Sequence, residues 1–347
     1  MKEIAFAWSG FPEYAARCIR GVIDRYPGKV SVIGTRPSFP IDGVEQILGR
    51  TLNWVDGQNK DLRWEDLQLD PPALFFQGGY HLPAFRALGA ECRAFGSAVI
   101  GQSDAPWRGT WRQALVDTVR HRLFLRRRFD GWFVPGQAGL RHARIMGYPP
   151  SNTKAGVLGA DPALFNGGRL LSQRPRTLLF VGQLDSNKNV LGLVKAFHRF
   201  VNDYPNWHLQ ICGTGPEMAH ILEHPNIDVA GFVPPAELVH KFRESRCLVL
   251  PSTREAWGLV VHEATLCGCA LALSSSVGAI DDLARPQNSV IFGPGSETEI
   301  EISLRKLANW DDGRWDEAET VSRELSHQFG PETFADAVDQ FISIFDP

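Results

Sequence analysis

The C-terminal half of the chain alternates short apolar runs with segments of helical periodicity, and this alternation restricts the fold more than any other feature. The apolar runs are TLLFV (177–181), WHLQIC (207–212), CLVLP (247–251) and CALALS (269–274). Continuous apolar runs of this length are typical of strands buried on both faces of a parallel sheet. Between the first two, residues 189–205 repeat apolar side chains at three- and four-residue steps, which predicts a helix. The pattern predicts βαβ units in a doubly wound sheet that binds ligands at the carboxyl ends of its strands.

The N-terminal half follows the same order with more interruptions. The runs EIAFAW, ALFFQ, SAVIGQ and DGWFVP each lead through small or polar residues into a helix-like segment. Between about Leu158 and Pro175 the pattern lapses into a stretch rich in Gly, Pro and Asp, which is typical of a linker. With 347 residues the chain is long enough for two domains. We expect an α/β fold with an N-terminal domain (1–165), a C-terminal domain (175–328) and a final helix (329–347) that packs back across the domain junction.

Charge and cysteine usage exclude several classes of protein. The chain has 36 Lys+Arg and 39 Asp+Glu, a net charge of -3, so no global field attracts nucleic acid. The six cysteines are scattered, and the close pair Cys267 and Cys269 has no second pair nearby, which argues against zinc and a disulfide framework. No signal-peptide core and no run of about 18 apolar residues occurs. We expect a cytoplasmic protein, soluble or peripheral on the inner face of a membrane.

The stretch STREAWGLVVHEATLCG holds two glutamates, Glu255 and Glu263, after a predicted strand. We expect a helix to begin near Trp257 or Gly258, which leaves its first amides free to hold an anion or sugar hydroxyls. Helix side chains lean toward the N-terminus, so Glu263 on the second turn can reach back toward Glu255. Two carboxylates over a helix N-terminus suit a ligand with many hydroxyls and a phosphate. The alternative is an ordinary strand, loop and helix with two solvated glutamates.

Two further loops follow predicted strands in this half. In LLFVGQLDSNKN, Lys188 stands just before the next helix, where an ammonium group can neutralise a diphosphate. In QICGTGPEM, Gly213 and Gly215 stand at a strand end, where the backbone either approaches something closely or merely turns. The structural alternatives are a solvated loop lysine and a simple turn.

The order of these motifs along residues 177–292 resembles the donor domain of glycosyltransferase family four, the retaining GT-B enzymes. The resemblance rests on the E-x7-E spacing in its place after the two glycine loops, and the N-terminal half shares less of it. It implies a GT-B fold: two doubly wound Rossmann-like domains that face each other across a cleft. In such a fold the N-terminal domain (1–165) would bind the acceptor, and the C-terminal domain (175–328) would bind the nucleotide-sugar donor. It also implies transfer of a sugar from a nucleoside-diphosphate sugar to a hydroxyl of a glycan or glycolipid, with retention of configuration. Polysaccharide biosynthesis is the usual context of such enzymes.

The resemblance assigns roles to individual residues. Glu255 would contact the donor sugar, Glu263 the ribose and Lys188 the diphosphate. The other expected donor contacts are Gly10, Gly182, Gln183, Gly213, Gly215, Phe232, Val233, Arg254, Ala256, Trp257, Gly258 and Leu259. The donor would be UDP- or GDP-linked, and no cofactor is implied. No divalent metal is expected either, because the lysine and the helix amides supply the positive charge and no D-x-D loop is present.

Two positions depart from the pattern of the family. An arginine usually stands beside the glycine of the first loop, where this chain has Gln183, and we expect Arg254 to compensate. The family often has a histidine near the reacting carbon, and the corresponding stretch FFQGGYHLPAF offers His81. Asp104 in GQSDAPW is the other candidate for a catalytic group on the acceptor side. A core or surface role is the alternative for His81.

Residues 107–129 form a locally basic stretch with apolar side chains in between. Its arginines are Arg108, Arg112, Arg120, Arg122, Arg126, Arg127 and Arg128. Such a segment can dock on an anionic membrane that bears a lipid-linked acceptor, or bind an acidic glycan. The alternative is a helix that covers the N-terminal sheet with Leu115, Val119 and Phe124 facing inward. No nucleic-acid partner is expected, because no stacking motif accompanies the charge.

Two other classes of protein compete with this reading. A dinucleotide-dependent oxidoreductase would show G-x-G-x-x-G after a strand, and CGTGPEM lacks the third glycine. A non-catalytic protein that binds a nucleotide sugar or a glycan stays open, given Gln183 and the displaced histidine. Turnover separates it from an enzyme.

Overall fold

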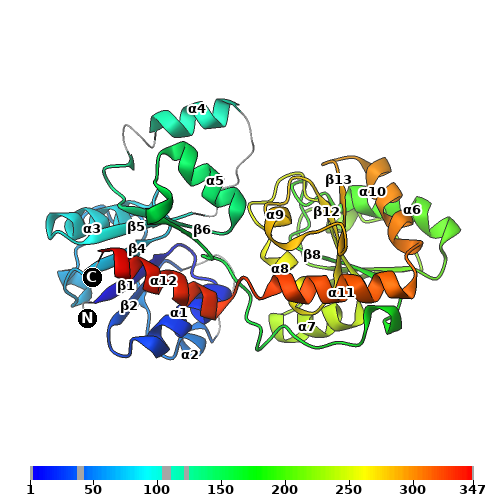
Figure 1. The fold of residues 1–347 in the computed structure, drawn as a ribbon, viewed down its shortest axis with the longest axis horizontal. Helices are drawn as coiled ribbons and strands as arrows, with labels where there is room; N and C mark the ends of the chain where they lie inside the picture. Colours follow the sequence, from blue (N-terminus) through cyan, green and yellow to red (C-terminus); the bar gives the residue numbers. More distant parts are fainter. Residues whose placement is uncertain (1–2, 37–42, 104–110, 121–124, 346–347) are drawn as a thin grey trace. The chain divides into compact units, whose positions relative to one another are not determined.

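The computed structural model describes residues 3–36, 43–103, 111–120 and 125–345. The chain divides into two compact units (Figure 1). Unit 1 combines Met1–Asp161 with Phe329–Pro347, and unit 2 is Pro162–Gln328. The chain passes from unit 1 to unit 2 inside the stretch predicted as a linker, and it returns to unit 1 for its last residues.

The described part of unit 1 is built on a parallel sheet with the strand order β3-β2-β1-β4-β5-β6-β7. The strands are β1 (Ile4–Trp8), β2 (Val30–Gly34), β3 (Asn53–Trp54), β4 (Leu74–Gln77), β5 (Ala98–Gln102), β6 (Gly131–Val134) and β7 (Thr153–Ala155). The helices are α1 (Glu13–Arg25), α2 (Val44–Leu48), α3 (Pro83–Ala94), α4 (Trp111–Arg120), α5 (Gln137–Met146) and α12 (Pro331–Phe345). The sequence predicts β1, β4, β5 and β6 and misses the other three strands.

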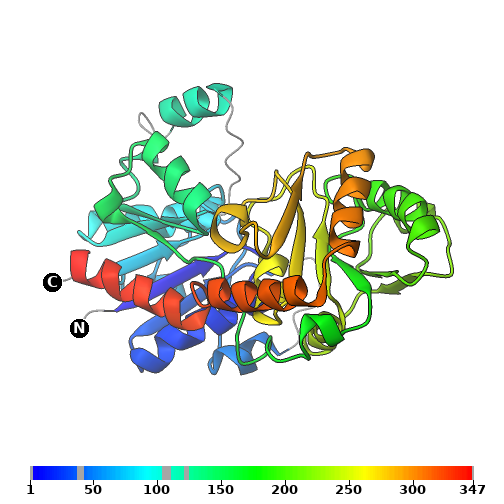
Figure 2. The ribbon, with the colours of Figure 1, turned by 45° about the vertical axis from the view of Figure 1, so that its right-hand side comes forward.

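Alternate side chains of β1 serve the two faces of the sheet of unit 1, as the two-residue period of a strand requires. Ala7 belongs to a core that includes Phe85 of α3. The ring of Phe6 lies 4.7 Å from that of Phe76 and 5.8 Å from that of Phe334 on α12. Helix α12 also lies along α1, as the red and blue helices of Figure 2 show. The C-terminal helix is therefore part of the core of unit 1.

The sheet of unit 2 is also parallel, with the strand order β10-β9-β8-β11-β12-β13 in the described residues. The strands are β8 (Thr177–Val181), β9 (His208–Cys212), β10 (Ile227–Gly231), β11 (Cys247–Leu250), β12 (Ala270–Ser274) and β13 (Ser289–Phe292). The helices are α6 (Val190–Asp203), α7 (Pro235–Glu244), α8 (Leu259–Leu266), α9 (Ile280–Leu283), α10 (Glu297–Ala308) and α11 (Asp312–Ser326). The predicted helix over 189–205 and the four predicted strands are confirmed within one or two residues, whereas β10 and β13 are missed.

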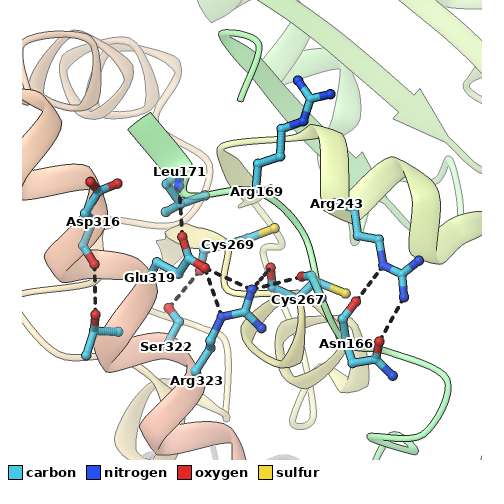
Figure 3. Close-up of polar contacts among 12 residues, drawn as sticks. Asn166, Arg169, Leu171, Arg243, Cys267, Cys269, Asp316, Glu319, Ser322 and Arg323 are labelled. Carbon is cyan, nitrogen blue, oxygen red and sulfur yellow. Dashed lines mark hydrogen bonds and ion pairs between the residues drawn. The ribbon is translucent and has the colours of Figure 1, made fainter. Parts of the chain in front are cut away.

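The second half of the predicted linker is fixed to unit 2 by polar contacts (Figure 3). Glu319 Oε2 accepts a hydrogen bond from the amide of Leu171 at 2.9 Å, and Oε1 accepts one from Arg323 Nε at 3.0 Å. Arg243 Nε donates to the carbonyl oxygen of Asn166 at 2.6 Å. These bonds satisfy backbone groups that a loop would otherwise leave to water, so this segment is an ordered part of unit 2.

Helix α4 corrects one expectation. Leu115 and Val119, expected to face inward, are 57% and 45% exposed, and Trp111 and Val116 are exposed as well. The helix lies on the outer side of α5 (Figure 1), where Thr118 Oγ1 donates to a carbonyl of α5. The side chains of Leu115 and Val119 therefore do not pack against the sheet of unit 1. Phe124, Arg108 and Arg122 lie outside the described residues.

The cysteines are buried and unpaired with one another. Burial raises the pKa of Cys212 to about 11 and the pKa of Cys92 to about 12. These thiols are therefore protonated at neutral pH and unreactive. Within the described ranges, no group of three or more metal-ligating side chains comes together, and no helix is both long and apolar enough to cross a membrane.

Candidate functional site

Three loops of unit 2 meet at one edge of its sheet, because β9, β8 and β11 are parallel neighbours. They are residues 182–189, 213–217 and 251–258. The carboxyl ends of the strands of an open α/β sheet are the usual place for a ligand. Most of the residues that the sequence predicts for donor binding lie in these three loops.

Lys188 and Glu255 form an ion pair at this edge of the sheet. Ser252 Oγ donates to the same carboxylate oxygen, Glu255 Oε2, at 3.2 Å. The side chains of the lysine and the glutamate are 23% and 13% exposed, so the attraction between them is less screened than in a solvated pair. Among the described residues these contacts engage Oε2 alone, which leaves Oε1 to a ligand.

A turn in LDSNKN sets the position of Lys188. Asp185 Oδ1 accepts hydrogen bonds from the amides of Asn187 and Lys188, at 2.9 and 3.0 Å. Asn189, the N-cap of α6, has a φ of 53°, a left-handed conformation that asparagine tolerates better than most residues. These polar residues turn the chain sharply and hold the lysine beside the strand end.

A buried tryptophan anchors the loop that carries Glu255. Trp257 is 1% exposed, and its Nε1 donates to Asp282 Oδ2 at 3.0 Å. The carbonyl oxygen of Trp257 accepts from the amide of Ala279 at 2.9 Å. The indole is therefore a structural anchor, and only the backbone of this residue can line a ligand.

Helix α8 begins close to the predicted position. Its first residue is Leu259, and Gly258, with a φ of 93°, is the N-cap. Ala256 precedes the cap and is half-buried. The first amides of a helix have no intrahelical acceptor and attract negative charge. Glu263 lies on the second turn, as expected.

The loop after β11 is bonded to the loop that carries Lys188. Arg254 Nη2 donates to Asn187 Oδ1 at 3.0 Å, and the amide of Thr253 donates to the carbonyl oxygen of Asn187 at 2.7 Å. Gln183, in the same loop as Lys188, is exposed. Arg254 thus stands beside the lysine loop, and its compensation for Gln183 stays a prediction.

The glycines of the first two loops allow close contact between backbones. A Cβ on Gly213 would lie 1.8 Å from the carbonyl oxygen of Gly182, and a Cβ on Gly215 would lie 2.4 Å from that of Leu184. The amide of Gly213 donates to the carbonyl oxygen of Gly231 at 2.6 Å. Of the two roles that the sequence suggests for G-x-G, a close backbone approach or a simple turn, the structure shows the close approach. The backbone that these glycines approach is that of the neighbouring loop.

Phe232 and Val233, expected near the base of the donor, follow β10. The side chain of Phe232 is 74% exposed, and Val233 is half-buried. Most of this ring is therefore in contact with water, which is unfavourable for an apolar side chain, and its exposed face can stack on a flat ligand.

Unit 1 contains a cavity of about 500 Å³ at the carboxyl ends of β1, β4 and β5, which we call the strand-end cavity. Gly10 and His81 both line it, together with Tyr80. Gly10 has a φ of 57°, and its amide donates to Thr35 Oγ1 at 2.9 Å. His81 is exposed. Asp104 lies outside the described residues.

Gln102, which no sequence motif indicates, also lines the strand-end cavity. It is 4% exposed, and neither atom of its carboxamide has a hydrogen-bond partner in the described structure. A buried polar group without a partner costs about 1–3 kcal/mol, which a ligand hydroxyl would offset. Its place at the end of the predicted strand SAVIGQ is the signal that could have identified it.

The chain matches one family model. Residues 168–319 match the model described as Glycosyl transferases group 1. The matched stretch lies within unit 2 and includes Lys188, Glu255 and Glu263.

Curated relatives match a similar part of the chain. The glycogen synthase of Mycobacterium tuberculosis (strain H37Rv) is 26% identical over 180 residues, which is 49% of this chain and 44% of the relative. An uncharacterized glycosyltransferase of Haemophilus influenzae is 29% identical over 147 residues, 41% of this chain and 42% of the relative. The chain therefore spans less than half the length of these relatives.

Solved structures are similar over the whole chain. Anabaena Alr3699/HepE in complex with UDP-glucose has a TM-score of 0.76 at 15% identity, over 99% of this chain and 100% of that chain. Sucrose-phosphate synthase from Thermosynechococcus elongatus has a TM-score of 0.71 at 14% identity, over 99% of each chain. At such identities the likeness shows the fold alone. The chain has the GT-B fold, with two Rossmann-like parallel-sheet domains, and its residues 168–319 match the glycosyl transferases group 1 family.

Proposed function

We propose that this protein is a glycosyltransferase that moves a sugar from a nucleoside-diphosphate sugar to a hydroxyl of a glycan or glycolipid. The observation that carries the proposal is the Lys188–Glu255 ion pair, which lies at the strand ends of the unit that matches the family. We expect a UDP-linked donor, because structures of the similar Anabaena protein hold UDP and UDP-glucose.

The loops of unit 2 supply the groups that such a donor needs. Lys188 and the first amides of α8 would hold the diphosphate, and Glu255 would accept hydrogen bonds from hydroxyls of the sugar. Glu263 would accept from the ribose, and Phe232 would border the base. In the free protein Glu255 already holds the ammonium group in place, so little side-chain entropy is lost when the donor binds.

The proposed reaction exchanges one bond at the anomeric carbon for another. The bond to the diphosphate oxygen breaks, and a bond to the acceptor oxygen forms while the acceptor hydroxyl loses its proton. Negative charge grows on the diphosphate, where Lys188 and the helix amides stabilise it without a divalent metal. Retention of configuration is part of the proposal because the E-x7-E motif resembles that of retaining enzymes; NMR of the product tests it.

The strand-end cavity of unit 1 is the proposed acceptor site. It offers the unpaired carboxamide of Gln102, the imidazole of His81 and the backbone of Gly10. A carboxamide both donates and accepts hydrogen bonds, so Gln102 can form direct hydrogen bonds with a sugar hydroxyl. Asp104 stays a candidate for the group that accepts the proton.

Thermal unfolding with UDP, GDP, ADP, dTDP and NAD at matched excess, without and with magnesium, tests the donor class. A ligand at about a hundred times its dissociation constant adds roughly 2.7 kcal/mol, which raises the melting temperature by a few degrees. We expect UDP to stabilise the protein without magnesium. Stabilisation by NAD alone, or a strict need for magnesium, would contradict the proposal.

Single substitutions test the ion pair. We expect Glu255→Ala to abolish transfer and Lys188→Ala to lower kcat by about a hundredfold or more, with melting temperatures within a few degrees of wild type. Lys195→Ala is the matched control, because Lys195 pairs with Glu297 at 3.2 Å on the exposed side of α6. Transfer at the wild-type rate by Glu255→Ala would remove Glu255 from the mechanism. Binding of UDP without any turnover in the wild type would instead favour the non-catalytic alternative.

We also propose that α4 makes peripheral contact with an anionic membrane that carries the acceptor. Its exposed side chains include Trp111, Leu115 and Val116, and basic residues flank it. A helix that is apolar on one face and basic on another lies in the plane of a membrane interface.

Cosedimentation with vesicles tests this contact. We expect binding to phosphatidylglycerol vesicles that weakens with salt and is lost in Leu115→Glu/Val116→Glu. Phe95→Glu is the control, because Phe95 is a 70% exposed aromatic residue elsewhere in unit 1. Equal binding by both variants would exclude α4 as the contact.

A further inference from the structure

Unit 1 has a second cavity, of about 630 Å³, beside α3 and the residues that lead into β6. Lys60, Arg86, Arg93 and Arg128 line it, and none of the described residues that line it is acidic. We call it the basic cavity. None of these residues belongs to the sites proposed above for donor and acceptor.

Among the described residues, only part of the positive charge of the basic cavity is balanced by ion pairs. Arg93 is neutralised, because its Nη1 lies 2.7 Å from Asp130 Oδ2. Lys60, Arg86 and Arg128 form no ion pair with any described residue. Burial and the nearby charge of Arg86 lower the pKa of Arg128. Like charges that lie close together without a counterion repel one another. An anion bound in this cavity would reduce that repulsion.

The floor of the basic cavity holds a buried amide. Gln77, the last residue of β4, is 3% exposed and lines the cavity. An amide in that position can donate to an oxyanion, as the guanidinium groups around it can.

A glycine in α3 makes room for this amide. A Cβ on Gly89, in the middle of the helix, would lie 2.4 Å from Gln77 Oε1. Glycine destabilises the interior of a helix relative to alanine. The glycine therefore costs helix stability, and in return it leaves room for the Gln77 carboxamide beside the cavity.

We propose that the basic cavity binds an oxyanion of the phosphate class. Arg86 and Arg128 would grip it with the forked geometry that guanidinium groups offer to phosphate, Lys60 would add charge, and Gln77 would donate from below. Tyr80 lines both this cavity and the strand-end cavity. The phosphate group can therefore be part of the acceptor or of a separate small molecule. The site itself does not depend on the proposed sugar transfer.

Calorimetric titration of the full chain with inorganic phosphate tests the site. Because hydrogen bonds between charged groups are the strong ones, we expect Arg86→Gln and Arg128→Gln each to weaken binding by about tenfold or more. Gln77→Leu should weaken it less. Arg144→Gln is the matched control, because Arg144 is an exposed arginine of unit 1 that forms no ion pair with a described residue and lies outside the cavity.

Melting temperatures separate a binding role from a structural one. In phosphate-free buffer, Arg86→Gln and Arg128→Gln should melt at or above the wild-type temperature, because each removes repulsion, and phosphate should no longer raise it. Absence of phosphate binding in the wild type, or equal affinity in wild type, Arg86→Gln and Arg128→Gln, would overturn the proposal. The response to UDP should be unchanged in both variants, so a failure here is distinct from a failure of the donor site.

Transfer assays with glucose and glucose 6-phosphate as acceptors show whether the bound phosphate group belongs to the acceptor or to a separate molecule. A preference for glucose 6-phosphate that is lost in Arg86→Gln assigns the group to the acceptor. Equal use of both, with phosphate binding retained, assigns the cavity to a separate ligand. Either result supports an oxyanion site.

Discussion

At the scale of single residues, His262 on α8 links stability to pH. The side chain is fully buried, and its Nε2 donates to the carbonyl oxygen of Ser326 at 2.8 Å. Burial is the main cause that lowers the pKa of His262 to about 4. The folded protein therefore keeps the ring neutral, and the ring joins α8 to the end of α11.

A loss of stability in mild acid follows from His262. Between pH 6.5 and pH 4 the unfolded chain binds a proton at this position and the folded chain does not, so stability falls as the pH falls. From pH 7.5 to pH 5 we expect this residue to remove about 2 kcal/mol of unfolding free energy. Urea unfolding at both pH values, in wild type and His262→Gln, measures it, because glutamine can still donate to Ser326. Equal losses in the two proteins would show that another group is responsible.

The sequence indicates charged candidates for a site more readily than neutral ones. Lys188 and Glu255 stand out because each follows a strand and belongs to a motif. Their contact is not visible in the sequence, since 67 positions separate them. Gln77 and Gln102 are missed because a glutamine at the end of a strand has no motif. Both side chains are buried, and the carboxamide of Gln102 has no hydrogen-bond partner among the described residues.

At the scale of elements, the sequence predicts most of the central strands but not the four edge strands of the described sheets; β2, a central strand of unit 1, is missed as well. The four strands predicted in unit 2 are its inner ones, whereas β10 and β13 are its edges. In unit 1 the edges β3 and β7 are missed as well. Edge strands are buried less, as the half-exposed pattern of β10 shows, so they lack the continuous apolar run that marks a central strand. For helix α4, the sequence pattern suggests an inward apolar face that the structure does not have. Its apolar side chains are exposed and pack against no layer of unit 1.

Because the loops after β8 and β9 are in close contact at Gly213, we expect substitution of this glycine to be costly. We expect Gly213→Ala to lower the stability of unit 2 by about 3 kcal/mol or more, because the added Cβ would lie 1.8 Å from a carbonyl oxygen. Gly231→Ala is the matched control: its φ is +69°, and nothing lies within 4 Å of an added Cβ. The control should cost only about 1–2 kcal/mol, the penalty of a left-handed alanine. Urea unfolding of both variants is the measurement, and equal costs would mean that the two loops move apart easily.

At the scale of the whole molecule, the chain closes unit 1 with its last helix. The sequence predicts a helix here that packs back across the domain junction, and α12 lies in the core of unit 1. On α12, Asp339 accepts from Arg25 at 2.7 Å and from the hydroxyl of Tyr26 at 2.6 Å. The fold of unit 1 thus depends on residues that follow the whole of unit 2, which ties the folding of one unit to the completion of the other.

Phe341 tests how far the two units depend on each other. It is fully buried, and its ring lies 5.6 Å from those of Phe76 and Phe133. We expect Phe341→Ala to destabilise unit 1 by about 3–5 kcal/mol, the usual cost of deleting a buried aromatic ring. Phe345→Ala, one turn further along the same helix at a half-exposed position, should cost much less.

Calorimetry with and without UDP separates the units in this experiment. If the donor binds unit 2 alone, the transition of unit 1 should fall in Phe341→Ala, while UDP still raises the transition of unit 2 as it does in the wild type. A single transition that falls as a whole would mean that the units unfold together. In that case α12 stabilises the entire molecule, and the donor would protect unit 1 as well.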